Sequence, residues 1–524
     1  MKRALLLTLI LSIATLGFSQ NEEARYNYIR KSITRNADGS TDYRQAFSLT
    51  VFTHTAMNST YGESFVAFNP QFQTVTINDA YTIRKNGKRI DLPANALVEV
   101  LPSSAAGAAD FNYLKEWVIV HTGLDLGSTI YLDYSIHTKP GFNKHLDYNF
   151  VVDESSPISE YSLTIALPEG QALHQALYSP EGQVAAASDV KANGQRTINY
   201  SIKNIPAHSR EGFQTTDLTR QWRFLCTTSD FETEMRELFY ASPDADIQAW
   251  GKEQVKTEPN VMKRLRAARQ YVARQFKVVP VPLKEVGSIR PFAQIKQGAY
   301  ITAYEQAAVL QQMLTACNIQ ADVQATFAPS LPKEFRTLNN AEKFLVTQQL
   351  GDSPVLISPD NDARPTSAPL VVGLSGEQAN PAKPININKE YTATIAAANL
   401  NGEGSYLYSL PADGAAVSGW RMQTLPTLRE TVFEIPAVVD ETHTYTIKTD
   451  GQVKLAGSYS TNLSGPDGAL LSETLSQAAD GTITLVRRIA LTRKTYTLQE
   501  YPAIRSIITT WLSPSHQKLL FVKK

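Results

Sequence analysis

The sequence predicts an α+β multidomain protein with an N-terminal antiparallel β-sandwich, a central α+β domain and a C-terminal β-sandwich region. Asn-Gly and Asp-Gly pairs, which favour tight β-hairpin turns, punctuate both ends of the chain but are absent between Gly194 and Asn401. Around these pairs apolar and polar residues alternate, as in residues 130–136, which is typical of half-buried strands. The stretch without such pairs carries helix-start signals instead.

The chain has 524 residues, enough for about three or four domains. The changes of pattern place a signal peptide at 1–20, the β-sandwich at 21–210, the central domain at 211–384 and the C-terminal β region at 385–524. Within the central domain we expect helices at about 229–240, 259–276 and 302–317. Strands at 321–326, 343–347 and 355–359 follow, and then a Pro- and Ala-rich exit linker at about 363–384.

Residues 1–20 have the features of a secretory signal, because Lys2 and Arg3 precede an apolar core that ends in small residues near Ser19. The competing interpretation is an uncleaved anchor. It is disfavoured because the apolar run is shorter than the ~20 residues that span a bilayer. We therefore expect a secreted protein of the periplasm or the cell exterior, with no transmembrane segment after cleavage.

Charge balance and missing motifs argue against several classes of function. The 50 Lys and Arg residues balance the 50 Asp and Glu residues, so no overall field attracts nucleic acid. The sequence contains no HExxH, CxxC, Walker or dinucleotide-binding pattern. We expect no metal and no cofactor.

The segment 302–317 is the most informative part of the chain. Thr302 and Glu305 form a T-x-x-E capping box, which makes Ala303 the first helical residue. Steps of four and three residues then predict one buried face, formed by Ala303, Ala307, Leu310, Leu314 and Cys317. Asn318 can adopt the left-handed conformation that ends such a helix.

In sequence, residues 298–323 resemble the core of the transglutaminase-like (papain-like) superfamily. There a glycine-rich turn delivers a nucleophilic cysteine onto the first turn of a helix, where the thiolate is favoured. The resemblance implies this fold for the central domain and puts Ala303 at the position of the cysteine. It puts Lys343 or Phe344 at the position of the family's histidine and Ser358 at that of its aspartate. Thiol catalysis needs the nucleophile, a base and an orienting group, so the resemblance implies a lost triad.

The flanking regions extend the resemblance. Residues 69–75, 80–83 and 127–130 are similar to a domain of unknown function that precedes transglutaminase-like domains in secreted bacterial proteins. Residues 501–524 resemble the companion β domain of the same architecture.

Two cysteines, Cys226 and Cys317, are present. In an oxidising compartment they could pair. The alternative is that each is a separate buried residue, and spacing alone does not decide between the two.

From these patterns we expect a non-catalytic transglutaminase-like protein with a binding or scaffolding role in the cell envelope. Its ligand would be an extended peptide or a glycan-linked peptide, held in the cleft around Thr302, Ala303, Tyr304 and Glu305. One alternative is an active protease or amidase whose histidine comes from a β domain folded over Ala303. Another is a structural β-rich spacer without a ligand.

Overall fold

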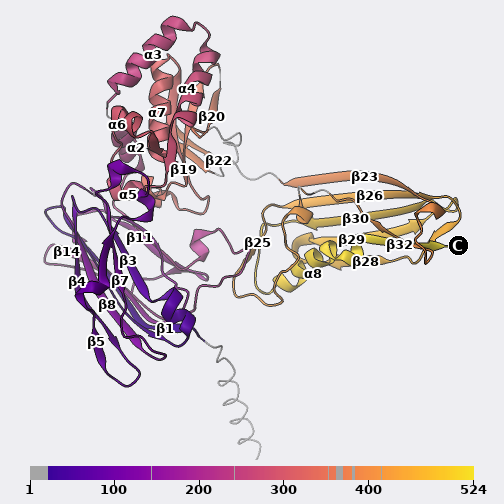
Figure 1. The fold of residues 1–524 in the computed structure, drawn as a ribbon, viewed down its shortest axis with the longest axis horizontal. Coiled ribbons are helices and arrows are strands. Elements are labelled where there is room, and N and C mark those ends of the chain that lie inside the picture. The colour runs from indigo at the N-terminus through magenta and orange to yellow at the C-terminus, as the bar shows by residue number, and fades with distance from the viewer. Residues whose placement is uncertain are drawn as a thin grey trace, which may run out of the picture. The chain divides into compact units, whose positions relative to one another are not determined.

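The computed structural model describes residues 22–142, 144–240, 242–351, 353–360, 370–379, 384–412, 414 and 416–524 (Figure 1). The expected signal peptide lies outside the described residues. The chain forms two compact units. The first comprises the residues up to 380 except 209–216, and the second comprises 209–216 together with 381–524.

An eight-stranded sheet dominates the N-terminal part. Its strand order is β13-β14-β10-β1-β2-β8-β4-β5. The bounds are β1 Ala24–Arg35, β2 Thr41–Val51, β4 Gln73–Ile83, β5 Arg89–Asp91, β8 Thr129–Thr138, β10 Ile158–Pro168, β13 Ser188–Ala192 and β14 Gln195–Ile205. The β13–β14 turn is Asn193-Gly194, with positive φ at both residues as a tight hairpin turn requires. The expected fully antiparallel pattern is wrong at one place, because β1 and β10 pair in parallel.

Two smaller sheets complete the N-terminal sandwich. One has the order β12-β11-β15-β9 and the other β3-β7-β6. Their bounds are β3 Glu63–Phe68, β6 Leu97–Val100, β7 Lys115–Val120, β9 Asp147–Val151, β11 His174–Ser179, β12 Gly182–Val184 and β15 Arg223–Thr227. Apolar residues of all three sheets form one buried cluster. β15 lies beyond the boundary expected at 210, because it pairs with β9 and β11 rather than with the central strands.

The central part combines helices with a five-stranded sheet of order β20-β19-β18-β21-β22 (Figure 1). The helices are α2 Phe231–Phe239, α3 Ala245–Thr257, α4 Val261–Gln275, α5 Leu283–Val286, α6 Phe292–Gly298 and α7 Ala303–Ala316. The sheet strands are β18 Gln320–Thr326, β19 Lys343–Gln349, β20 Pro354–Ile357, β21 Leu370–Gly373 and β22 Gly376–Ala379, and β16 Lys277–Val279 pairs with β17 Tyr300–Thr302.

Three expectations for this part need correction. The helix expected from about 229 begins at Phe231, because the carboxylate of Asp230 accepts from the Glu232 amide and caps α2 there. α3 was not expected. The predicted exit linker contains β21 and β22, which complete the central sheet because β21 pairs with β18.

The C-terminal unit has a five-stranded sheet of order β23-β26-β30-β29-β28, a three-stranded sheet β24-β32-β27 and a two-stranded pair β25-β31. The bounds are β23 Ile385–Ile395, β24 Ser405–Ser409, β25 Phe433–Glu434, β26 Val439–Thr449, β27 Val453–Leu455, β28 Ser460–Ser464, β29 Leu470–Gln477, β30 Ile483–Leu491, β31 Thr495–Tyr496 and β32 Lys518–Lys523. A helix, α8 Tyr501–Leu512, was missed inside the expected β region. It buries Ile504, Ile508 and Trp511 at helical spacing.

Candidate functional site at the start of helix α7

Helix α7 begins at Ala303, as expected. The Thr302 hydroxyl accepts from the Glu305 amide at 3.3 Å, and a Glu305 carboxylate oxygen accepts from the Thr302 amide at 2.9 Å. Asn318 has φ 60° and ends the helix in the left-handed conformation. The capping box and the C-terminal stop predicted from sequence are therefore both confirmed.

The burial of α7 differs from the single buried face that its spacing predicts. Residues on every side of the helix are buried, because α3 and α4 cover one side while β18 and β19 cover the other. Ala303 and, near the other end of the helix, Thr315 are exposed, although Ala303 belongs to the predicted buried stripe. Of the four residues expected to line the cleft, Thr302, Tyr304 and Glu305 are buried, so Ala303 alone faces outward.

The topology brings the three positions implied by the family resemblance to one end of the central domain. α7 has 14 residues and β18, which returns antiparallel after a tight turn, has 7, so the two elements have similar lengths of about 21 and 23 Å. In the β18–β19 pair Thr326 lies opposite Lys343. In the β19–β20 pair Val346 lies opposite Ile357. Ala303, the start of β19 and Ser358 therefore share that end of the layer.

The side chains at these positions differ from the thiol, imidazole and carboxylate of the family's triad. Phe344 is half-buried and packs its ring against Phe239, with centroids 5.5 Å apart. Lys343 is exposed. Ser358 is buried, and its hydroxyl donates to the carboxylate of Asp360.

The alternative of an active protease or amidase would need a histidine ring over Ala303. Five imidazoles have a partner within their own domain: His121 with Ser64, His137 with Asp42, His208 with Asp153, His443 with Glu441 and His516 with Glu473. These partnerships give no support to the alternative of a histidine supplied to α7 from a β domain.

A buried ion pair that the sequence did not reveal holds the start of α7. The Arg290 guanidinium donates to both Glu305 carboxylate oxygens, from Nε at 2.9 Å and from a terminal nitrogen at 2.7 Å. The Arg290 backbone amide also donates to Glu305, at 3.1 Å. The Glu305 side chain is fully buried. Burial lowers the pKa of Arg290, but the hydrogen bonds and charge of Glu305 outweigh it and raise that pKa above its ordinary value.

The N-terminal domain reaches this ion pair. Arg290 donates to Asp110 at 2.7 Å, and the Asp110 backbone amide donates to the Tyr300 hydroxyl at 2.6 Å. The neighbouring Phe111 is buried in the same apolar cluster as the α7 side chains, and the Arg290 guanidinium lies 4.6 Å from its ring centre. Local sequence signals do not reveal such a contact, since it joins residues 180 positions apart.

Both cysteines are free and buried, so the disulfide considered from sequence is not formed. Cys226 belongs to the core of the N-terminal sandwich, and Cys317 belongs to the core around α7. Their strands and helices belong to different cores, which explains why they do not meet. Burial raises the pKa of both thiols, which makes them poor nucleophiles.

The described residues show neither a metal site nor a membrane-spanning helix. Within them, no group of three or more His, Cys, Asp or Glu side chains is arranged to hold a metal ion. The helices in the same ranges are all too short or too polar to cross a bilayer.

Comparisons with known proteins give the following matches. Residues 37–209 match a domain of unknown function with a solved structure, DUF3857, and residues 405–521 match a second such domain, DUF3858. A crystal structure of a "putative protease" from Parabacteroides distasonis is 34% identical, covers 95% of this chain and 99% of its own, and has a TM-score of 0.77. No functionally curated protein matches the chain.

A more distant structural match is the M1 zinc metallopeptidase from Deinococcus radiodurans. It is 9% identical, covers 49% of this chain and 56% of its own, and has a TM-score of 0.20. That similarity is too low to inform the fold or the function.

Proposed function

Because this chain belongs to the same family as the Parabacteroides distasonis protein, we propose that its central domain has a transglutaminase-like fold that binds its ligand without cleaving it. The description of the relative as a "putative protease" supports descent from a hydrolase family. The order of elements in the central domain, a capped helix followed by three antiparallel strands, agrees with the proposed fold. The two flanking domains of unknown function agree with the proposed architecture.

The observation that carries the proposal is the exposed methyl group of Ala303. A family nucleophile would project from this first turn of α7, and the residues on either side of Ala303 are buried and fixed by the capping box. An alanine there offers surface but no reacting atom, and Phe344 and Ser358 offer no base. The position is therefore suited to contact a ligand and unsuited to attack it.

The ligand that we propose is an extended peptide, free or linked to a glycan. Enzymes of the proposed fold act on amide bonds, so a descendant that has lost its nucleophile would retain affinity for peptide. The proposal also places the protein in the periplasm or outside the cell, on the strength of the signal-like residues 1–20. Fractionation of expressing cells tests the location, and a cytoplasmic pool of uncleaved protein would contradict it.

Binding is tested by calorimetry with two probes, a disaccharide-peptide fragment of bacterial cell wall and the same peptide without the sugars. We expect Ala303→Trp to weaken binding at least about tenfold, because the large ring covers the exposed position. Arg266→Trp, which adds the same ring at an exposed site on α4, is the matched control. Unchanged binding by the Ala303 variant would place the ligand elsewhere, and no binding to either probe would favour the spacer interpretation.

Catalysis is tested separately. Purified protein is assayed for peptidase, deamidase and transamidase turnover with and without iodoacetamide. We expect no turnover that alkylation removes, since the native thiols are buried. Turnover sensitive to alkylation would overturn the non-catalytic proposal even if the peptide binds.

A further inference from the structure

A short segment from the middle of the chain is part of the C-terminal unit. Residues 209–216 follow the last strand of the N-terminal sheet and precede β15, yet they belong with 381–524. Gln214 forms an antiparallel bridge with Phe433, and the Glu434 amide donates to the Phe213 carbonyl at 2.9 Å. The segment thus adds a bridged piece of backbone beside β25.

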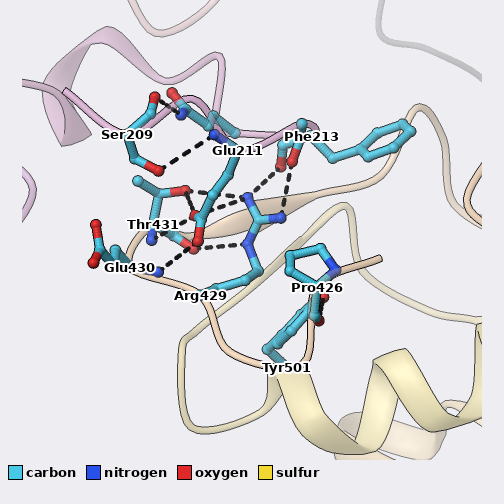
Figure 2. A network of polar contacts seen from close by, with 10 residues as sticks. Ser209, Glu211, Phe213, Pro426, Arg429, Glu430, Thr431 and Tyr501 are labelled. Carbon is cyan, nitrogen blue, oxygen red and sulfur yellow. Dashed lines mark hydrogen bonds and ion pairs between the residues drawn. The ribbon is translucent and has the colours of Figure 1, made fainter. Parts of the chain in front are cut away.

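A buried arginine binds the backbone of this segment. The Arg429 side chain is 1% exposed. Its guanidinium donates to the carbonyls of Gly212 at 2.8 Å and Phe213 at 3.4 Å, and it lies over the rings of Phe433 and Tyr501. Figure 2 shows the guanidinium pointing at the segment from the loop that carries Arg429. Burying an arginine is costly unless its donors are satisfied.

The side chains of the segment are bound as specifically as its backbone. The Glu211 carboxylate accepts from the amides of Glu430 at 2.9 Å and Thr431 at 3.1 Å, and from the Thr431 hydroxyl at 2.7 Å (Figure 2). It also lies 3.5 Å from Arg429. At the other end of the segment the Thr216 hydroxyl donates to Glu434 at 2.7 Å.

Phe213 anchors the middle of the segment. Its ring packs on the apolar core of the C-terminal unit and meets Phe433 edge to face, with centroids 6.1 Å apart. Its backbone has φ 59°, in the left-handed region that bulky residues rarely adopt. Such a conformation persists where the surroundings fix it.

Backbone pairing, an aromatic anchor and a bound carboxylate are means by which domains recognise peptide segments. We propose that the C-terminal domain is a peptide-binding module, built around Arg429, whose ligand is the chain's own Glu211-Gly212-Phe213 segment. This inference is independent of the function proposed for α7. Its consequence is that the C-terminal domain stays attached to residues 1–380 without the covalent link at 381–383.

The test uses the full chain with a specific protease site inserted at 381–383. After cleavage, we expect the two fragments to elute together in size-exclusion chromatography. An excess of a synthetic peptide with the sequence of residues 207–217 should release the C-terminal fragment. A peptide with Glu211→Ala and Phe213→Ser should fail to release it.

Substitutions in the segment and at Arg429 test which residues hold the two fragments together. The double variant Glu211→Ala, Phe213→Ser changes only the larger fragment and leaves the C-terminal fragment unaltered. It should weaken the affinity between the two fragments roughly thirtyfold or more. Arg429→Ala should do the same, and Arg488→Ala, at an exposed ion pair of the same domain, is the matched control. Circular dichroism of each fragment checks folding. Folded wild-type fragments that separate, or double-variant fragments that stay together, would overturn the proposal.

Discussion

Arg290 and Glu305 are joined by three hydrogen bonds, two from the guanidinium and one from the arginine's backbone amide, and Glu305 is fully buried. The same carboxylate accepts from the Thr302 amide, so one side chain both caps α7 and holds the loop before it. The first turn of α7 is therefore fixed at the place where Ala303 reaches the surface. A preorganised but unreactive surface is the feature that the proposed binding role needs.

Arg290→Ala should destabilise the central part strongly. It leaves the buried Glu305 carboxylate without its cationic partner, a loss that typically costs about 3–5 kcal/mol. The stability of Arg290→Lys should lie between those of the wild type and Arg290→Ala, because lysine keeps the charge but cannot form the bidentate contact with the carboxylate. Urea unfolding followed by circular dichroism measures the effect. Arg266→Ala, at an exposed site on α4, should change stability by less than about 0.5 kcal/mol. An equally small effect for Arg290→Ala would show that the ion pair is not buried in solution.

Ala303→Cys should create one reactive thiol without creating an enzyme. The wild-type protein should react slowly with a thiol reagent, since Cys226 and Cys317 are buried. The new thiol is exposed on the first turn of a helix, where the dipole lowers a thiol pKa. Acyl transfer should stay near background, since the proposed function gives this thiol no base and no orienting group. Robust turnover by the single variant would mean that Lys343 or Phe344 does not stand at the histidine position.

Asp147→Asn should stabilise the protein at neutral pH. Burial raises the pKa of the Asp147 carboxyl to about 6, although Asn339 donates to it at 2.9 Å. A raised acid pKa means that the wild type loses stability as pH rises from about 4 through about 6, because the folded protein must ionise a buried group. The variant does not titrate, so its advantage should be near zero at pH 4 and on the order of 3 kcal/mol at pH 8.

Thermal unfolding across that pH range measures the difference. The matched control is Asp189→Asn, because hydrogen bonds from Arg196 lower the pKa of the exposed Asp189 carboxyl. This substitution should therefore destabilise the protein at neutral pH instead of stabilising it. A gain in stability from Asp147→Asn that did not depend on pH would contradict the raised pKa of Asp147.

Gly251→Ala should destabilise the packing of α3 on α7. A Cβ atom at Gly251 would lie 2.3 Å from the Cβ of Ala316 and 2.7 Å from its backbone carbon. Overpacking of this kind costs about 1–3 kcal/mol. Gly170→Ala is the matched control, because no atom lies within 4 Å of the added methyl group. Equal effects of the two substitutions in chemical unfolding would mean that α3 does not approach α7 so closely.

The parts of the fold that sequence predicted well are those fixed by neighbouring residues. The Thr302–Glu305 capping box and the Asn318 stop act within a few residues, and both have the expected geometry. α3 was missed because its helix buries few apolar residues and depends on the distant contact of Gly251 with Ala316. The linker expected at about 363–384 contains β21, because that strand depends on pairing with the distant β18 and not on its own composition.

The same reason explains what was missed in the candidate site. Ala303 could be placed from the local pattern, but the pattern alone predicted that it would be buried. Its exposure depends on which elements cover α7. The ion pair with Arg290 and its extension to Asp110 join distant parts of the chain, and no spacing in the sequence signals them.

The position of residues 209–216 has a consequence for how the protein is made. Gly212 lies 217 residues before Arg429, so at synthesis rates of about 5–20 residues per second it waits roughly 10–40 seconds for its partner. During that interval the central helices can form around α7, but this segment has no sheet to join. A closure over so long a loop also makes this contact a late event. Its polar composition, with Phe213 as the single aromatic residue, suits a segment that must stay soluble until the last domain emerges.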